Sequence, residues 1–299
     1  MMRNGQAFGL AARVAGEVVA ERRGWYSFLP ERIRTRPFVR GFPVLVETLV
    51  NGIKSLNRSA ELQGEADGQP MEGWHLVLTM LAALVFAMVL FLLIPHGLSW
   101  LLGYVGLSSG VEGVAFQLWD GVFKLLMLMG YISIIARVPE IRRVFQYHGA
   151  EHKTIHAFET GLPVDAALAR RQSRLHPRCG TTFLLFVICI SVLLHALLVP
   201  LLLYLWTPEN AVLKHLVTLV FKLALLVPIA SLSYELIRFS GCMREGPLAT
   251  ALRAPGLLLQ RLTTAEPEMD QLEVAVVALR EALGPDSPYE VRTCPYRTL

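Results

Sequence analysis

Six side chains that could bind a metal ion or transfer a proton lie close together, in residues 147–183. They are His148, Glu151, His152, His156, His176 and Cys179. Half of the eight histidines of the chain fall in this short polar segment, which separates two long apolar runs. Imidazole and thiolate are ligands that zinc favours in proteins. The segment therefore predicts a metal site, with zinc as the expected divalent ion, at the surface of a membrane.

The first part of this segment has the spacing of a helical metal site. If residues 147–159 are helical, His148, His152 and His156 lie along one face, four residues apart. The run from His148 to His152 also matches the pattern H-x-x-E-H, in which two histidines bind zinc and the glutamate, here Glu151, is the general base. The alternative is an amphipathic surface helix whose imidazoles face solvent or lipid headgroups.

The second part, HPRCG, adds an imidazole and a thiol just before an apolar run. A thiol at a helix N-terminus near arginines has a lowered pKa, which favours the thiolate as ligand or nucleophile. Two histidines of the first part with His176 or Cys179 would give three protein ligands and an open position, as catalytic zinc requires. Lys153 or Arg178 would then stabilise a developing oxyanion. Alternatively, the turn and Arg178 bind an anionic lipid headgroup without any metal.

Four apolar runs are long enough to cross a bilayer, which takes about 20 helical residues. They cover residues 76–94, 114–136, 182–205 and 211–233. No apolar run precedes them, so we expect a multi-pass membrane protein made without a cleaved leader.

The positive charges predict the orientation of these spans. Lys and Arg concentrate before residue 76, in residues 137–178 and after residue 237, whereas the loops near 95–113 and 206–213 hold almost none. Because positive residues stay on the cytoplasmic side, we expect both termini and the histidine-rich segment to face the cytoplasm. The net charge of +4 then reflects contact with anionic membrane lipids, and no nucleic-acid partner is needed. The four cysteines are expected to be reduced.

The remaining sequence predicts smaller elements around an all-α membrane core. We divide the chain into a cytoplasmic region 1–73, a four-span core 74–240 with a cytoplasmic loop 138–181, and a cytoplasmic helical region 241–299. The first region should hold a β-hairpin at 10–26, an amphipathic helix at 37–58 and a linker at 61–73. That helix lies in the membrane interface or packs on the protein itself. The last region should hold a segment 246–262 interrupted at Pro255 and an amphipathic helix from about Thr264 to Gly284.

Charged residues inside the spans are costly and face protein or water. Asp120 and Lys124 are one helical turn apart, which predicts an ion pair. Lys222 could share Asp120 and extend a polar track toward the cytoplasmic site. His195 is expected to be a packing residue, and Glu235 could reach the histidines as a ligand or as a partner of one.

Several sequence blocks together resemble the YqhQ-like family of bacterial membrane proteins. They include MMRNG, PFVRGFPVLVETLVNGIKSLNRSA, FQYHGAEHKTIHAFE, QSRLHPRCGTTF, PGLLLQRLTTAEP and QLEVAVVAL, in the same order and spacing. The family is a domain of unknown function that is sometimes described as a predicted metal-dependent enzyme. The resemblance implies functional roles, which do not extend to His156, for His148, Glu151, His152, Lys153, His176, Arg178 and Cys179.

Two functions are consistent with these patterns. One is a metal-dependent hydrolase that acts on a membrane-associated substrate at the cytoplasmic interface. The other is a non-catalytic scaffold or lipid-handling protein, in which the histidines, Cys179 and Arg178 are structural or bind headgroups.

Overall fold

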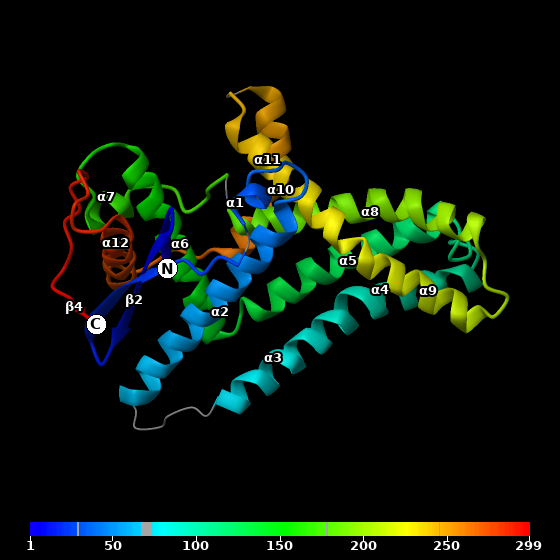
Figure 1. The fold of residues 1–299 in the computed structure, drawn as a ribbon, viewed down its shortest axis with the longest axis horizontal. Helices are drawn as coiled ribbons and strands as arrows, with labels where there is room; N and C mark the ends of the chain where they lie inside the picture. Colours follow the sequence, from blue (N-terminus) through cyan, green and yellow to red (C-terminus); the bar gives the residue numbers. More distant parts are fainter. Residues whose placement is uncertain (29, 67–72, 178, 245) are drawn as a thin grey trace.

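Four long apolar helices form an elongated bundle, with a small sheet and several shorter helices gathered at one end (Figure 1). This computed structural model describes residues 1–299 except 29, 67–72, 178 and 245. The helices long and apolar enough to cross a membrane are Leu78–Tyr104, Val114–Ile135, Gly180–Leu205 and Ala211–Cys242. The chain is therefore a membrane protein with four candidate spans, as its hydropathy predicts. We call the end with loops 105–113 and 206–210 the loop end.

The first span is longer than its sequence predicts. Helix α3 (Gly73–Met88) passes through a π-helical turn, η1 (Val89–Leu93), into α4 (Ile94–Tyr104). The predicted loop 95–113 begins at Pro95, and a proline normally ends a helix because it lacks an N–H. Here Pro95 lies in the first turn of α4, directly after the wider π turn, where its missing N–H costs little. His96 is consequently inside the bundle.

The fourth span is two helices, α9 (Ala211–Ala224) and α10 (Leu226–Cys242), rather than one. Pro228 cannot donate to the carbonyl of Ala224, so the helix is interrupted one turn earlier, at Leu225. Lys222 thereby lies in the last turn of α9, where the helix dipole favours a positive charge. The second and third spans are α5 (Val114–Ile135) and α8 (Gly180–Leu205).

A four-stranded sheet replaces the simple hairpin that was expected. Its strands, in spatial order, are β1 (Met2–Asn4), β2 (Ala7–Val14), β3 (Glu17–Gly24) and β4 (Arg297–Thr298). The predicted hairpin is present as β2 and β3, but the C-terminal tail returns to pair in parallel with β3. This pairing is non-local, so the periodicity of either segment alone does not reveal it.

Helix α12 (Met269–Leu283) carries the sheet and joins it to the segment that holds the histidines. It begins with a capping box between Glu268 and Gln271 and ends at Gly284, so the predicted C-terminal helix is confirmed. One side of α12 packs on Val18 and Ala20 of β3. Another side packs on helix α6 (Pro139–Glu159) in a core that includes Ala150, Ala157, Leu272, Val276 and Leu279.

Helix α11 (Pro247–Thr263) runs without a break through Pro255, so the expected interruption there is wrong. Gly256 has no side chain, which lets α11 approach α8 closely. A Cβ at this position would lie 2.3 Å from Cγ2 of Thr182. This tertiary packing offsets the hydrogen bond that Pro255 cannot donate.

Helix α2 (Gly41–Ala66) follows the short helix α1 (Glu31–Arg34) and packs against α10. Its buried side is polar, with Glu47 1% and Asn51 2% exposed, whereas Leu49 and Leu56 are exposed. The helix thus packs on the protein and also presents apolar side chains outward. It extends to Ala66, beyond the start of the expected linker at 61–73, and residues 67–72 lie outside the described part.

Candidate metal centre

The histidine row lies on α6, as its spacing predicts. The helix begins upstream of the predicted residue 147, because Val138 is extended and Pro139 occupies its first turn. It ends at Glu159, just before Gly161, whose φ of +74° favours glycine. The rings of His148 and His152 are 4.5 Å apart, centroid to centroid.

Cys179 meets this row from the start of α8. It is the N-cap residue of that helix, and its Sγ accepts a hydrogen bond from the backbone amide of Thr181 at 3.4 Å. The distance from Sγ to Nε2 of His148 is 3.2 Å. One ligand atom each from His148, His152 and Cys179 lie within 4.8 Å of one another. We call these three residues the His/Cys cluster, and Cys179 and His152 are buried.

Backbone carbonyls fix the orientation of both imidazoles. The Nδ1 atom of His148 lies 2.9 Å from the carbonyl oxygen of Thr263, and that of His152 lies 2.6 Å from the carbonyl oxygen of Arg174. A carbonyl can only accept, so each Nδ1 must carry the proton and donate it. The Nε2 atoms are then unprotonated in the neutral rings and available as ligands. Metal-bound histidines in proteins are held in this way.

The two imidazoles also stabilise the thiolate form of Cys179. Burial alone would raise the pKa of the Cys179 thiol, but hydrogen bonds from His148 and His152 outweigh it and lower the pKa to about 5. Burial would lower the pKa of His148, but its hydrogen bond to the sulfur and the negative charge there raise it. The two residues therefore form a thiolate–imidazolium pair when no other cation neutralises the sulfur.

His176 lies in a neighbouring group rather than with Cys179. Its ring is 5.8 Å from the ring of His152 and 4.7 Å from that of His156, and its Nε2 lies 3.6 Å from Oε1 of Glu159. We call His156, Glu159 and His176 the His/Glu cluster; one ligand atom each from these residues also lies within 4.8 Å of the others. The sequence left open whether His176 or Cys179 completes the site, and the turn geometry brings the thiol to His148.

Gln260 holds this turn in place and was not singled out by its sequence. Its Oε1 accepts from the amide of His176 at 2.8 Å, and its Nε2 donates to the carbonyl of His176 and to the hydroxyl of Thr182. The side chain is fully buried. A glutamine within the apolar run GLLLQRL is the signal that could have identified it, because a buried amide needs hydrogen-bond partners.

The expected catalytic side chains are engaged elsewhere. Nζ of Lys153 donates to the carbonyls of Arg170 and Gln172, at the end of helix α7 (Ala166–Arg170) and just after it, and pairs with Glu266 at 2.7 Å, so its three donors are engaged. Glu151 pairs with the amine of Met1 at 2.6 Å. The predicted role of Arg178 falls on a residue outside the described part of the chain.

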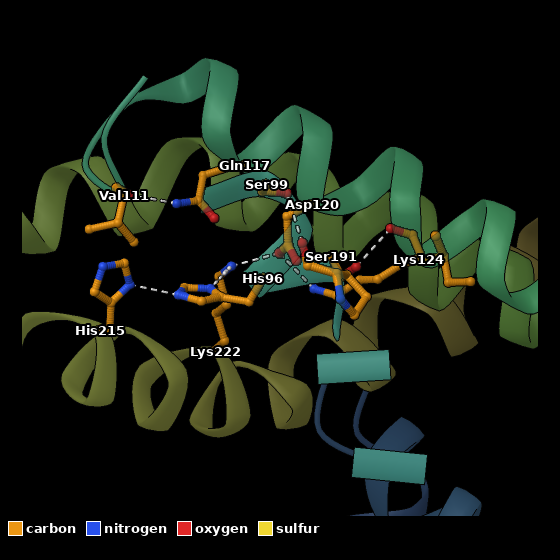
Figure 2. A network of polar contacts seen from close by, with 11 residues as sticks. His96, Ser99, Val111, Gln117, Asp120, Lys124, Ser191, His215 and Lys222 are labelled. Atoms are coloured by element: carbon orange, nitrogen blue, oxygen red, sulfur yellow. Dashed lines mark hydrogen bonds and ion pairs between the residues drawn. The ribbon is translucent and has the colours of Figure 1, made fainter. Parts of the chain in front are cut away.

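Two expected polar connections to the site are wrong. Glu235 does not reach the histidines, because Arg40 binds both its carboxylate oxygens, at 2.7 and 2.6 Å. This hydrogen bond raises the pKa of Arg40. The polar track from Lys222 runs toward the loop end instead, since its ammonium contacts His96 of the extended first span (Figure 2).

Replacing Gly149 with alanine should disturb the cluster through the backbone. An added Cβ would lie 2.3 Å from the carbonyl oxygen of Ala265, close to the Thr263 carbonyl that orients His148. We expect a loss of about 1–3 kcal/mol in the free energy of unfolding. Thermal unfolding in detergent would measure it. The matched control is Gly52→Ala in α2, where a Cβ meets no atom within 4 Å; an equal loss there would contradict the argument.

The fold and the cluster define a class: a membrane protein with four candidate spans and a largely buried group of two histidines and a cysteine, formed by α6 and the start of the third span. The chain belongs to the family described as "Protein of unknown function (DUF1385)", which matches residues 36–285. It is 33% identical over 264 residues to "Uncharacterized protein YqhQ" of Bacillus subtilis (strain 168), covering 84% of this chain and 78% of that protein. The resemblance to the YqhQ-like family is confirmed. No solved structure matches the chain.

Proposed function

We propose that the chain is a zinc-dependent hydrolase that acts on a membrane-associated substrate at the cytoplasmic face of the bacterial inner membrane. His148, His152 and Cys179 would hold the ion. The observation that supports this most is the pairing of both Nδ1 atoms with backbone carbonyls, which directs both Nε2 atoms to the thiolate. The positive residues that flank the spans at this end favour its placement in the cytoplasm.

The donor set suits a catalytic ion. Two imidazoles and one thiolate are three protein ligands, and catalytic zinc leaves a further position for water or substrate. A bound zinc ion would supply Lewis-acid chemistry there, by polarising a carbonyl or phosphoryl oxygen. The carbonyls of Thr263 and Arg174 hold the rings, and His148 is only half-buried, so the cluster is open toward the surface on its side. The affinity of such a site falls at low pH, because protons compete for its ligands.

Glu151 is the proposed general base. Its negative charge acts on His148, one helical turn away. Its carboxylate is partly exposed and paired with the Met1 amine, so this pair must open before the carboxylate can accept a proton from a water. Lys153 is a positioning residue in this proposal, since it holds the turn that carries the Arg174 carbonyl.

The alternative, a non-catalytic protein that binds a lipid headgroup at the start of α8, has less support. A helix N-terminus attracts an anion because its amides lack partners. Here the sulfur of Cys179 already accepts from the amide of Thr181. A headgroup phosphate would therefore compete with a negative sulfur atom at the same position.

Metal analysis of the purified full chain tests the proposal. We expect about one zinc ion per chain in the wild type, and background levels in Cys179→Ser. Glu151→Gln should keep the ion, because its carboxylate is not among the ligands. Cys294→Ser is the matched control, since this thiol packs beside β3 and α12 rather than at the cluster. A metal-free wild type with an intact helical spectrum, or full zinc content in Cys179→Ser, would end the proposal.

Cobalt substitution tests the open position. A cobalt ion bound by Cys179 should give a thiolate charge-transfer band that Cys179→Ser abolishes. Acetohydroxamate, which ligates exposed metal ions, should shift the d–d bands of the cobalt protein if a position is open. Bands that do not respond to it would indicate a closed, structural site and would exclude hydrolysis by this centre.

A further inference from the structure

A second polar group lies inside the membrane-spanning part and shares no residue with the His/Cys cluster. Asp120 and Lys124 of α5 and Lys222 of α9 are 1%, 7% and 3% exposed, and His96 of α4 is 6% exposed. Figure 2 shows these side chains converging between the helices. Ionisable groups at membrane depth are costly and mark ion or proton pathways in membrane proteins.

The charges of this group do not balance. Both ammonium groups contact the same atom, Oδ2 of Asp120, at 2.8 Å from Lys124 and 2.6 Å from Lys222. Among the described residues no second carboxylate pairs with either lysine. One carboxylate compensates one ammonium, so the three groups are neutral only when one lysine has lost its proton. In a medium of low dielectric constant the neutral and charged states then compete.

A chain of hydrogen-bonding groups connects one of the lysines to the loop end. Nζ of Lys222 lies 3.5 Å from Nδ1 of His96, and Nε2 of His96 lies 2.9 Å from Nδ1 of His215 (Figure 2). The first distance is at the limit of a hydrogen bond, and a small rotation of the lysine stem closes it. His215 is partly exposed, and the edge of its ring meets Trp100. An imidazole accepts a proton on one nitrogen and releases one from the other, so the two rings can pass a proton.

The other polar neighbours of the two lysines are buried on α5 and α8. On α5, Lys124 pairs with Asp120 one turn away within the same helix. On α8, His195 is buried and close enough to interact with the charges of both lysines, and its Nε2 has no hydrogen-bond partner in the described structure. Toward the His/Cys cluster, α5 continues with Leu128 and Ile132, which are buried in an apolar core. The hydrogen-bonded path therefore reaches the surface at the loop end, whereas apolar side chains separate it from the His/Cys cluster.

We propose that Lys222 is a proton-binding site inside the membrane, which protons reach from the loop end through His215 and His96. A proton taken up by His215 moves to His96 and then forms the third N–H bond of the Lys222 amine. Both imidazoles return to their neutral state, and the site gains one positive charge. Release follows the same route in reverse. This site is independent of the proposed metal centre.

The protonation of Lys222 can be followed by NMR of the full chain in lipid nanodiscs, with lysine labelled with 13C at Cε. The chain has five lysines, so Lys222→Met assigns the signal. We expect the Lys222 signal to change between its ammonium and amine positions as the pH passes through the neutral range, while that of the exposed Lys54 does not. A Lys222 signal that moves only together with that of Lys54 would overturn the proposal.

A charge-balancing variant gives the sharpest test. Lys124→Met leaves one carboxylate and one ammonium, a neutral pair that has no proton to release. We expect the Lys222 signal in this variant to keep its ammonium position across the same pH range. If the three groups had only a structural role, removing Lys124 would not be expected to keep Lys222 in its ammonium form. Unchanged titration of Lys222 in Lys124→Met would contradict the charge count.

The path is tested in sealed vesicles in which the chain has one orientation. A pH step at the loop end should change the Lys222 signal, and a step at the His/Cys end should not. His96→Phe should slow this response at least tenfold and leave its final extent unchanged. Equal responses from both sides, or an unchanged rate in His96→Phe, would show that protons arrive by another route. The matched control is Lys214→Met, which removes a pair with Glu112 at the loop end without interrupting the chain.

Discussion

Replacing Asp120 with asparagine is expected to lower the free energy of unfolding by about 3–5 kcal/mol, which is the cost of breaking a buried pair from one side. The variant keeps the shape of the side chain but leaves two buried lysines, 2.8 and 2.6 Å from the substituted oxygen, without a counter-charge. This loss is large, because most single substitutions lower the free energy of unfolding by about 0.5–3 kcal/mol. Chemical or thermal unfolding of the full chain in lipid nanodiscs would measure the loss.

Lys124→Met is the matched control for this prediction. It removes one of two ammonium groups from the same site and leaves Asp120 paired with Lys222. The remaining pair is balanced, so the loss should be well below that of Asp120→Asn. The double variant Asp120→Asn/Lys124→Met leaves a single unpaired lysine and should fall between the two. If Asp120→Asn and Lys124→Met were equally destabilising, the uneven charge of the site would not control its stability.

Cys179 should remain reactive at a pH where an ordinary thiol is inert. Because its pKa is lowered to about 5, most of the side chain is thiolate at neutral pH in the metal-free protein. The alkylation rate of Cys179 by iodoacetamide, in the presence of a chelator, should be constant from pH 8 down to about pH 6 and fall below about pH 5. A low pKa also lowers the intrinsic nucleophilicity of a thiolate, so the shape of the pH profile, rather than the absolute rate, is the test. Peptide mass spectrometry resolves each cysteine.

Cys294 is the internal control, because burial raises the pKa of its thiol. Its alkylation rate should rise throughout the same interval, by about tenfold per pH unit. In His148→Ala the profile of Cys179 should move to higher pH, since the hydrogen bond that lowers the pKa of the thiol most is lost. A Cys179 profile parallel to that of Cys294 in the wild type would contradict the thiolate–imidazolium pair.

The lowered pKa of Cys179 also makes the stability of the folded protein depend on pH. A thiol whose folded pKa lies below its unfolded value stabilises the folded state at high pH. This stabilisation of the metal-free protein is lost as the pH falls from the ordinary thiol value of 9.0 toward about 5. His148 acts in the opposite direction, because its raised pKa stabilises the folded state below the ordinary histidine value and this contribution disappears at higher pH. Above the ordinary histidine value the loss from His148 therefore offsets part of the gain that Cys179 gives as the pH rises.

Local patterns in the sequence determined the elements that carry both sites. Hydropathy identified the four spans, and the spacing of the histidines identified their helix, because burial in a bilayer and helical periodicity act over neighbouring residues. The pairing of Asp120 with Lys124 also follows from spacing within one helix. Family membership, carried by short blocks along the chain, was evident from the sequence as well.

Contacts between distant segments were decided only by the tertiary structure. Cys179 rather than His176 joins His148 because Gln260 of another helix fixes the turn between them. The return of the C-terminal strand to the sheet depends on pairing across nearly the whole chain. His96 meets Lys222 only because a π turn carries the first span past Pro95. Each of these outcomes depends on contacts between separate segments, which the hydropathy and spacing of a single segment do not encode.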